Sequence, residues 1–372
     1  MRVGLICPYS LTVPGGVQGQ VLGLARSLRH AGVEARVLGP CDGPPPEPWV
    51  TPLGNSLPTG DNGSVAAIAP DPAASLRTLR ALRDEAFDVV HIHEPLAPGP
   101  SITAMVTAAC PTIGTFHRSG RSRWLEATRP LARWTAAHLT LMVAVSEEAR
   151  ATAAAILPGR FVLLWNGIEV ARYRDAEPWP TQGPTIFFVG RHESRKGLAV
   201  LLEALDRLGP DVRLWVAGQG PDTERLRRQS AADRRVEWLG FVDDAEKVRR
   251  LRGADVLCAP SLHGESFGVV LLEGLAAATP VVATDLAGYR NVARPGIEAR
   301  LVVPGDASAL AGALTAALER SPETEALVAR GLERAAEYSM DSLAERYIEL
   351  YQQVVRARPA LASTRMGRAR YQ

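Results

Sequence analysis

The sequence has 372 residues, of which 46% are apolar and 22% are charged, and its formal net charge is +2. This composition is that of an ordinary globular protein with about two or three domains. The nearly balanced charge gives no reason to expect a nucleic-acid partner. No apolar run reaches the length of a transmembrane helix or of a signal-peptide core, so we expect a cytoplasmic protein.

The cysteines are scattered along the chain and never form a Cys-x-x-Cys pair; they are Cys7, Cys41, Cys110 and Cys258. This spacing argues against a zinc site and against a disulfide framework. Free cysteines of this kind fit a reducing compartment.

Short apolar runs alternate with helical patterns along the whole chain. In the first half these runs occupy residues 2–7, 35–39, 87–93, 112–116, 139–145 and 160–165. In the second half they occupy residues 185–190, 212–217, 235–240, 254–260, 280–284 and 300–304. Continuous apolar strands separated by helices are typical of parallel sheets covered on both faces. The pattern therefore predicts an α/β fold with one doubly wound, Rossmann-like domain in each half.

The boundary between the halves is expected near residues 169–185, which contain three prolines and no apolar period. Residues 43–64 have a similar composition, and we interpret them as a long surface loop inside the first half. The basic C-terminal tail is expected to be disordered. The predicted segments are a first domain at 1–170, a second domain at 171–340, a helix at 341–356 that packs back on the first domain, and the tail at 357–372.

Polar motifs follow the predicted strands of the first half. Gly15 and Gly16 precede a helical pattern, so they form either a simple turn or an anion site at the helix N-terminus. His91 and His93 alternate on one strand, and we interpret them as cleft-lining residues because no third ligand with metal-site spacing follows. His117 comes directly after the next strand, where ligand contacts are common.

Cations follow the first strand of the second half, in the stretch FVGRHESRKG. Arg191, Arg195 and Lys196 suit a diphosphate, since each charge-assisted contact contributes about 1.5–3 kcal/mol; the alternative is a solvated basic turn. The next strand is followed by Gly218 and Gly220 without the third glycine of a dinucleotide fingerprint. An oxidoreductase is therefore a remote alternative.

Two glutamates, Glu265 and Glu273, lie in the stretch CAPSLHGESFGVVLLEGLAAATPVVATD. A carboxylate among apolar residues is costly to bury unless it is paired. We expect Ser266, Phe267 and Gly268 to present backbone N–H groups to a diphosphate where a helix begins. Glu265 would then accept hydrogen bonds from sugar hydroxyls, and Glu273 from a ribose diol. The alternative is one capping acid and one surface acid.

Together these motifs resemble the retaining glycosyltransferases of family four, which have the GT-B fold. The resemblance covers residues 1 to about 355 and rests on PGGVQ, HIHEP, TFH, WNGIE, FVGRHESRKG, VAGQGP, LGFVDDAEK, GESFGVVLLE and LVVPGD. Within the family, CPYS, VPGGVQ, NGSVA and DVVHIHEP resemble the actinobacterial phosphatidylinositol mannosyltransferases. The resemblance implies two Rossmann-like domains that face a central cleft, the first for the acceptor and the second for the sugar nucleotide.

The resemblance also implies a reaction, in which a sugar, most simply mannose from GDP-mannose, moves to phosphatidylinositol or a related inositol lipid. Donor contacts in the second half would come from Arg191, Lys196, Val242, Asp244, Lys247, Glu265, Ser266, Phe267, Gly268 and Glu273. In the first half, Gly16 would let the chain approach the phosphates and His117 would lie near the donor sugar. The catalytic residues implied are His117, Arg191, Lys196 and Glu265.

The donor of such an enzyme already carries a good leaving group. The protein then has to align donor and acceptor and to neutralise charge on the departing diphosphate. The resemblance implies front-face displacement, and we find no second carboxylate pair that must supply a covalent nucleophile. Arg191 and Lys196 take the place of a metal site, so no cofactor is required; Mg²⁺ can accompany the donor without a protein ligand.

The acceptor side departs from the family pattern. Thr12 stands where an acid is expected before VPGG, and Ala67 where a basic residue is expected after NGSVA. The remaining acceptor candidates are Tyr9, Asn62, Arg118 and Arg121. Leucines and arginines share residues 75–87, which predicts either peripheral contact with the anionic inner face of the cell membrane or a half-buried helix.

Two alternative functions remain open at this stage. One is a glycosyltransferase with a soluble acceptor such as inositol phosphate, and the other is a sugar-nucleotide-binding protein without turnover. Vesicle binding distinguishes the lipid acceptor from the soluble one. Product formation distinguishes an enzyme from a binding protein.

Overall fold

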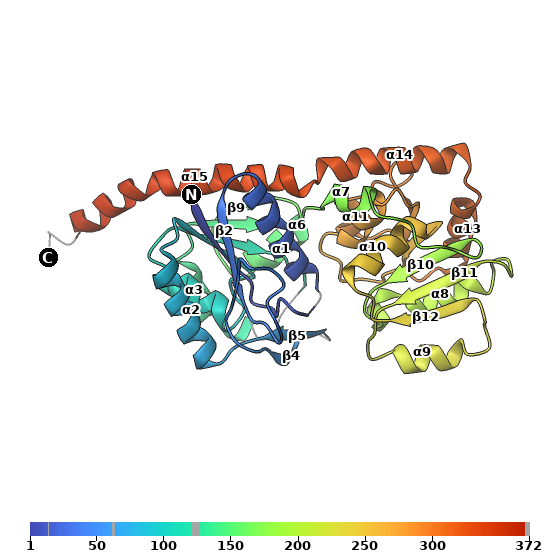
Figure 1. Ribbon diagram of the computed structural model, residues 1–372, viewed down its shortest axis with the longest axis horizontal. Helices are drawn as coiled ribbons and strands as arrows, with labels where there is room; N and C mark the ends of the chain where they lie inside the picture. The colour runs from blue at the N-terminus through green and yellow to red at the C-terminus, as the bar shows by residue number, and fades with distance from the viewer. Residues whose placement is uncertain (14, 62–63, 121–125, 369–372) are drawn as a thin grey trace. The chain divides into compact units, whose positions relative to one another are not determined.

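The computed structural model describes residues 1–13, 15–61, 64–120 and 126–368 (Figure 1). The chain divides into two compact units, one formed by Met1–Gly167 with Met340–Gln372 and the other by Ile168–Ser339. Each unit has its own parallel sheet. The predicted α/β fold with two Rossmann-like domains is therefore confirmed.

The first unit contains a sheet of seven parallel strands in the order β3-β2-β1-β6-β7-β8-β9. The strands are β1 (Arg2–Ile6), β2 (Glu34–Gly39), β3 (Val50–Pro52), β6 (Val89–His93), β7 (Thr112–Phe116), β8 (Leu141–Ala144) and β9 (Phe161–Leu163). All except β3 coincide with predicted apolar runs. The strand order reverses between β1 and β6, and ligands of doubly wound sheets bind beyond the carboxyl ends of strands at such a reversal.

Residues 43–64 differ from the prediction of a long irregular loop. They contain β3, which extends the sheet, and β4 (Leu57–Asp61), which pairs in antiparallel register with β5 (Ser64–Ile68). The prediction is wrong here because prolines and glycines were taken as loop signals. Short strands form nonetheless where a neighbour supplies the pairing, as Val37 of β2 does for Val50.

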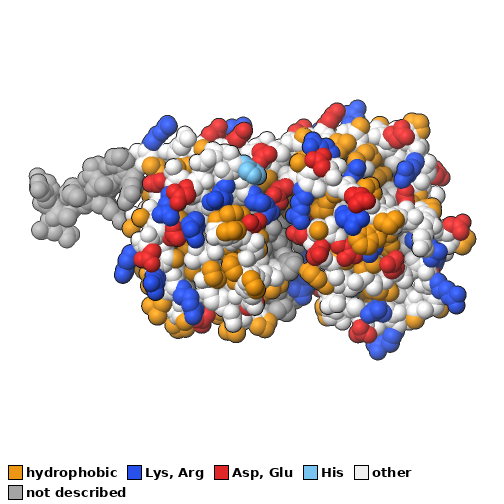
Figure 2. Space-filling model, viewed as in Figure 1, with side chains coloured by type: hydrophobic (Ala, Val, Ile, Leu, Met, Phe, Trp, Pro, Cys, Tyr) orange, Lys and Arg blue, Asp and Glu red, His pale blue; other side chains and the backbone are white. Residues whose placement is uncertain are grey.

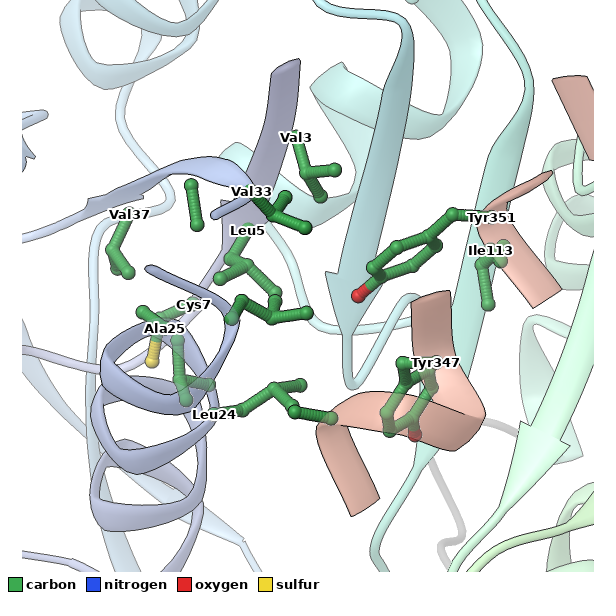
Figure 3. Close-up of a cluster of buried hydrophobic side chains, with 14 of the residues drawn as sticks. Val3, Leu5, Cys7, Leu24, Ala25, Val33, Val37, Ile113, Tyr347 and Tyr351 are labelled. Carbon is green, nitrogen blue, oxygen red and sulfur yellow. The ribbon is translucent and has the colours of Figure 1, made fainter. Parts of the chain in front are cut away.

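Helices cover both faces of this first sheet (Figure 1). They are α1 (Gly16–His30), α2 (Pro72–Glu85), α3 (Pro100–Thr107), α5 (Arg129–Ala136), α6 (Glu147–Ala154) and α15 (Met340–Arg368). Figure 3 shows side chains from β1, α1 and α15 in one buried cluster on one face. Helices α2, α3, α5 and α6 pack on the other face, around Ile92 and Met105. Asp71 and Ser146 cap α2 and α6 through their side-chain oxygens.

The last helix, α15, belongs to the core of the first unit. Tyr347 and Tyr351 are 2% and 0% exposed and lie within its main hydrophobic cluster. The helix is described as far as Arg368. The expectation of a disordered tail at 357–372 stays a prediction.

The second unit contains a sheet of six parallel strands in the order β12-β11-β10-β13-β14-β15. The strands are β10 (Thr185–Val189), β11 (Arg213–Ala217), β12 (Val236–Gly240), β13 (Val256–Ala259), β14 (Val281–Thr284) and β15 (Arg300–Val302), and all coincide with predicted runs. The strand order reverses between β10 and β13. The loops that follow these two strands are therefore the expected ligand-binding loops.

The helices of the second unit surround this sheet. They are α7 (Val170–Arg174), the 3-10 turn η1 (Ser194–Lys196), α8 (Leu198–Leu205), α9 (Thr223–Gln229), α10 (Asp244–Gly253), α11 (Val269–Ala276), α12 (Ala287–Arg290), α13 (Ala307–Leu318) and α14 (Pro322–Glu337). Leucines of α8 and α13, such as Leu201 and Leu314, pack together against β10. Figure 2 shows that acidic and basic side chains are intermixed over the visible surface, in keeping with the nearly balanced charge.

Candidate active site

Two loops meet at the reversal point of the second sheet. The loop after β10 carries Arg191, Arg195 and Lys196, and the loop after β13 carries Glu265. Because β10 and β13 are hydrogen-bonded neighbours, both loops leave the same edge of the sheet. Lys196 and Arg195 are in contact with Glu265 across the two loops, whereas Arg191 pairs with Glu193 of its own loop.

Glu193 holds two of the cations in place. Its side chain is 7% exposed, and its carboxylate lies 2.7 Å from Nε of Arg191 and 2.8 Å from Nε of Arg195. Both guanidinium groups are therefore oriented by one buried carboxylate. Sequence reasoning missed Glu193, although an acid inside the basic stretch RHESRK was an available signal.

Lys196 and Glu265 pair across the two loops. Nζ of Lys196 lies 2.6 Å from Oε1 of Glu265, and the Ser261 hydroxyl donates to the same oxygen at 2.9 Å. Nη1 of Arg195 is 3.7 Å away. The side chains of Lys196 and Glu265 are 21% and 11% exposed, so the pair is largely shielded from water. A diphosphate that enters here meets cations whose positions are already set, which is the arrangement that stabilises developing charge.

Glycines allow the backbones around this ion pair to approach one another. Gly197 has a φ of +71°, and a Cβ at this position would collide with the carbonyl oxygen of Pro260. A Cβ at Gly288 would collide with the carbonyl oxygen of Glu265. The loops that follow β10, β13 and β14 therefore lock together only because these positions lack side chains.

Helix α11 begins directly after Ser266, Phe267 and Gly268. Gly268 has a φ of +95°, and within the described chain no side chain caps the helix. The Phe267 ring is anchored: the residue is 3% exposed, and its ring centroid lies 5.7 Å from that of Tyr338. A helix start without a side-chain cap suits an anion as the capping group.

The second glutamate, Glu273, lies on α11 and has its own cation. Lys247 of α10 donates to Oε1 of Glu273 at 2.9 Å, and Tyr173 of α7 donates to the same oxygen at 3.0 Å. Burial alone would lower the pKa of Lys247, but Glu273 and Asp244 outweigh it and hold this pKa above its usual value. The pairing explains how a carboxylate is tolerated in an apolar helix. Sequence reasoning missed Tyr173 because 100 positions separate it from Glu273.

The start of α10 contributes two further candidates, Val242 and Asp244. The Asp244 carboxylate lies 3.4 Å from Nζ of Lys247 and 3.5 Å from Nη1 of Arg172. Burial raises the pKa of Asp244, but these two cations outweigh it, and the pKa ends below its usual value. Val242 is half-buried beside them in sequence, while Asp243 caps the helix and so has a structural role.

Both lysines of the chain belong to the candidate site. Lys196 and Lys247 are the only lysines in the sequence, where Lys and Arg together number 42. Each of them contacts one of the two glutamates. The scarcity of lysine is a sequence signal that motif reasoning did not use.

In the first unit, His117 follows β7 and is 8% exposed. Its Nε2 lies 2.9 Å from Nδ1 of His93, and its Nδ1 lies 3.2 Å from Oδ1 of Asn166. Its backbone N–H donates to Glu94 at 2.6 Å. Burial lowers the pKa of His117 to about 4, so the ring is neutral near pH 7.

His91 and His93 are core residues of the first unit, 0% and 2% exposed, so the interpretation that they line a cleft is wrong. His91 contacts the Tyr351 hydroxyl at 2.8 Å and the Thr115 hydroxyl at 2.7 Å. Burial lowers the pKa of His91 to about 3 and holds that of His93 well below its usual value. The alternating pattern correctly predicted that His91 and His93 lie on one strand, but it did not predict that this strand is buried on both faces.

The three buried histidines, His91, His93 and His117, predict a loss of stability in mild acid. Unfolded histidines take up protons below about pH 6.5, whereas the folded rings stay neutral until pH falls further, so the free energy of unfolding should fall from pH 6.5 towards pH 4. The expected slope is about 1.4 kcal/mol per pH unit for each histidine. Burial raises the pKa of Glu94, so this carboxylate takes up its proton more readily in the folded state and opposes the trend. It contributes one proton, whereas the histidines contribute three.

Denaturant unfolding of the full chain at pH 7, 6 and 5 measures this slope. His91→Asn should make the slope shallower because it removes one of the three groups. A free energy of unfolding that stays constant between pH 7 and pH 5 would contradict the assignment of neutral buried rings.

The remaining candidates are in the first unit. Gly16 is the first residue of α1. Among the described residues, apart from its chain neighbours and the backbone of the helix itself, no heavy atom lies within 4 Å of the position a Cβ would take, so packing does not require glycine there. Tyr9 is half-buried and forms a β-bridge with Ile68. Arg118 is half-buried and follows His117. Asn62 and Arg121 lie outside the described residues. Among the described residues, no group of three or more His, Cys, Asp or Glu side chains is arranged to hold a metal ion.

Comparison with known proteins identifies relatives that cover most of the chain. The family model described as Glycosyltransferase Family 4 matches residues 14–172, and the model described as Glycosyl transferases group 1 matches residues 169–334. A protein of Mycobacterium leprae named phosphatidyl-myo-inositol mannosyltransferase is 42% identical, over 95% of this chain and 97% of its own. Its namesake from Mycolicibacterium smegmatis is 40% identical, over 95% and 94%.

Solved structures agree on the fold. The crystal structure of Anabaena HepE in complex with UDP-glucose superimposes with a TM-score of 0.76 at 18% identity, over 95% of this chain and all of that one. The WaaG glycosyltransferase of lipopolysaccharide biosynthesis superimposes with a TM-score of 0.68 at 20% identity, over 94% of this chain and 99% of that one. At these identities the likeness concerns the fold alone.

Proposed function

This chain is a member of glycosyltransferase family 4, and from that premise we propose that it transfers mannose from GDP-mannose to phosphatidylinositol with retention of configuration. The observation that carries the proposal is the contact of Lys196 and Arg195 with Glu265 beside the start of α11. Fixed cations and a helix N-terminus together suit the diphosphate of a sugar nucleotide. The mycobacterial relatives named for mannosyl transfer support mannose as the sugar and an inositol lipid as the acceptor.

We assign the chemical work to the loops after β10 and β13. Arg191 and Lys196 neutralise the charge that develops on the leaving diphosphate, which in water-poor surroundings is the largest single contribution to such a reaction. Glu193 keeps Arg191 in place, and Glu265 both orients Lys196 and accepts hydrogen bonds from the sugar hydroxyls. In this scheme a metal bound by the protein is not needed, and Mg²⁺ enters only with the donor.

The other donor contacts follow from the second carboxylate. Glu273 accepts hydrogen bonds from the two hydroxyl groups of the ribose. Lys247, Asp244 and Val242 at the start of α10 lie beside the base. Ser266, Phe267 and Gly268 offer the diphosphate the start of α11. In the first unit, Gly16 and His117 keep the roles that the family resemblance implies.

The test is product formation by the full chain. GDP-mannose, UDP-glucose and ADP-glucose are each incubated with phosphatidylinositol, and lipid products are identified by mass spectrometry. The proposal expects a mannosylated inositol lipid from GDP-mannose and stereochemical retention in its new bond. Donor binding without product from any acceptor would instead identify a sugar-nucleotide-binding protein.

A lipid acceptor requires the chain to reach a membrane surface. None of the helices in the described part of the chain combines the length and the apolar character needed to cross a bilayer. We infer peripheral contact through α2, where Leu76 is 66% exposed and Arg80 and Arg83 are also exposed. Exposed leucine and arginine on one helix suit the surface of an anionic membrane.

Removing these charges should weaken membrane binding. Each arginine near an anionic surface contributes about 1 kcal/mol, so Arg80→Ser with Arg83→Ser should lower the partition into phosphatidylinositol-containing vesicles by about thirtyfold at low salt. Co-sedimentation measures the partition. Arg207→Ser with Arg225→Ser, which removes the same charge from the second unit, is the matched control. Equal binding of both double variants would exclude α2 as the contact.

A soluble acceptor is the second candidate, and a specific observation favours it. Thr12 and Ala67 stand where the family resemblance predicts an acid and a basic residue. The Thr12 hydroxyl instead accepts a hydrogen bond from the backbone of Asp42 at 2.9 Å. A chain that ignores anionic vesicles and mannosylates inositol phosphate would establish this candidate.

A further inference from the structure

Three histidine rings lie side by side at the carboxyl ends of β6 and β7. The ring centroids of His91 and His93 are 4.3 Å apart, and those of His93 and His117 are 5.1 Å apart. All three residues are at least nine-tenths buried. The proposed function uses only His117, so the role of the ring next to it is open.

Both ring nitrogens of His117 are occupied by protein groups. Nε2 faces Nδ1 of His93 at 2.9 Å, and Nδ1 faces Oδ1 of Asn166 at 3.2 Å. A neutral imidazole has one N–H donor and one acceptor lone pair. Because Oδ1 of Asn166 can only accept, His117 must donate through Nδ1, and its lone pair is on Nε2.

The proton on His93 follows from this order. The lone pair on Nε2 of His117 needs a donor, so His93 carries its proton on Nδ1. Nε2 of His93 is then an acceptor, and it has no hydrogen-bond partner among the described residues. A buried acceptor without a partner is less unusual than a buried N–H without one, so this observation independently favours the same proton order.

We propose that His93 is a positioning residue that donates its Nδ1 proton to Nε2 of His117 and thereby holds the His117 ring in the Nδ1–H tautomer. The ring of His117 then has no free lone pair and cannot act as a general base. What His117 offers the reaction is position: its backbone N–H is bound by Glu94 at 2.6 Å, and its ring is bound from both sides. The kinetic consequence rests on the proposed function, whereas the tautomer does not.

Two substitutions separate a hydrogen-bonding role from a packing role. His93→Asn keeps an N–H donor close to the position of Nδ1, whereas His93→Leu fills the space without a donor. Loss of one such hydrogen bond at a reacting centre corresponds to about a tenfold change in rate. We expect kcat to fall about tenfold in His93→Leu and to return to within about threefold of the wild type in His93→Asn.

The tautomer is measured directly by ¹⁵N NMR of the histidine side chains in the full chain, with His117 assigned by substitution. The wild type and His93→Asn should show a protonated Nδ1 and a hydrogen-bonded, unprotonated Nε2 for His117. In His93→Leu the Nε2 signal should shift as its donor is lost. His91→Leu is the matched control, because it removes an equally buried ring from the same strand and should leave the His117 signals unchanged.

Each outcome decides a different point. A proton on Nε2 of wild-type His117, or a His93→Asn variant that folds but loses as much rate as His93→Leu, would overturn the positioning role. A wild type that forms no glycosylated product in any assay would refute the proposed function instead. In that case the NMR comparison of His93→Asn with His93→Leu still decides the proton order.

Discussion

Lys196→Ala should lower kcat by about 100- to 1000-fold, equivalent to about 2.7–4 kcal/mol of barrier, while the chain stays folded. The charge of Lys196 is fixed by Glu265 at 2.6 Å before any ligand arrives, so its loss removes a preorganised contact to the departing diphosphate. The fold should survive because Glu265 keeps the Ser261 hydroxyl at 2.9 Å and Arg195 at 3.7 Å. Steady-state kinetics with saturating GDP-mannose measure the effect.

The matched control for this variant is Arg207→Ala. Arg207 also pairs with a glutamate in the second unit, at 3.3 Å, but the pair lies on the surface within α8 and the turn that follows it. Surface pairs of this kind contribute about 0–1 kcal/mol to stability, so the variant should stay folded. Because Arg207 has no role in the proposed site, its turnover should match the wild type. If Lys196→Ala keeps turnover within about threefold of the control, Lys196 does not stabilise the leaving group.

Glu273→Gln should raise the Kd for GDP-mannose by about 10- to 100-fold and change kcat much less. A hydrogen bond to a charged group contributes about 1.5–3 kcal/mol, and a ribose diol far from the transferred carbon contributes equally in the ground and transition states. Local structure should persist, because the glutamine carbonyl can still accept from Tyr173 and Lys247. Calorimetric titration of the donor and of GDP alone measures the two Kd values.

Glu237→Gln is the matched carboxylate control in the same unit. Glu237 accepts a hydrogen bond from the indole N–H of Trp215 at 2.9 Å. It lies on the edge strand β12, whereas α11 follows β13, and β11 and β10 separate these two strands in the sheet. Its variant should bind GDP-mannose with the wild-type Kd. If Glu273→Gln binds the donor as tightly as Glu237→Gln does, the ribose contact is wrong.

The repeating strands were predictable because burial on both faces of a parallel sheet makes each strand a continuous apolar run. The same reasoning failed for the predicted loop at residues 43–64, where β3 and β4 form among prolines and glycines. These strands depend on pairing partners such as Val37, and pairing between distant segments leaves no local period in the sequence.

In the site, too, some residues could be predicted from their position after a strand, and others could not because their roles depend on contacts. Lys196 and Glu265 were predictable as members of one site because both follow strands at the reversal point of one sheet. Their direct contact came only from the structure. Tyr173 and Glu193 were not, because their roles come from contacts: a hydroxyl 100 positions from Glu273, and an acid whose importance depends on its burial between two arginines. The histidines of HIHEP illustrate a different error, since this polar pair was interpreted as lining a cleft and is buried in the core.

The most direct measurement follows the two lysines themselves. In protein labelled with ¹³C at lysine, only Lys196 and Lys247 contribute side-chain signals, and Lys247→Arg assigns them. If the pairs Lys196–Glu265, before the start of α11, and Lys247–Glu273, on α11, bind the sugar nucleotide, both lysine signals should shift during a titration with GDP-mannose and saturate at one Kd. Lysine signals that stay in place at donor concentrations that raise the Tm of the chain would mean that the nucleotide binds elsewhere.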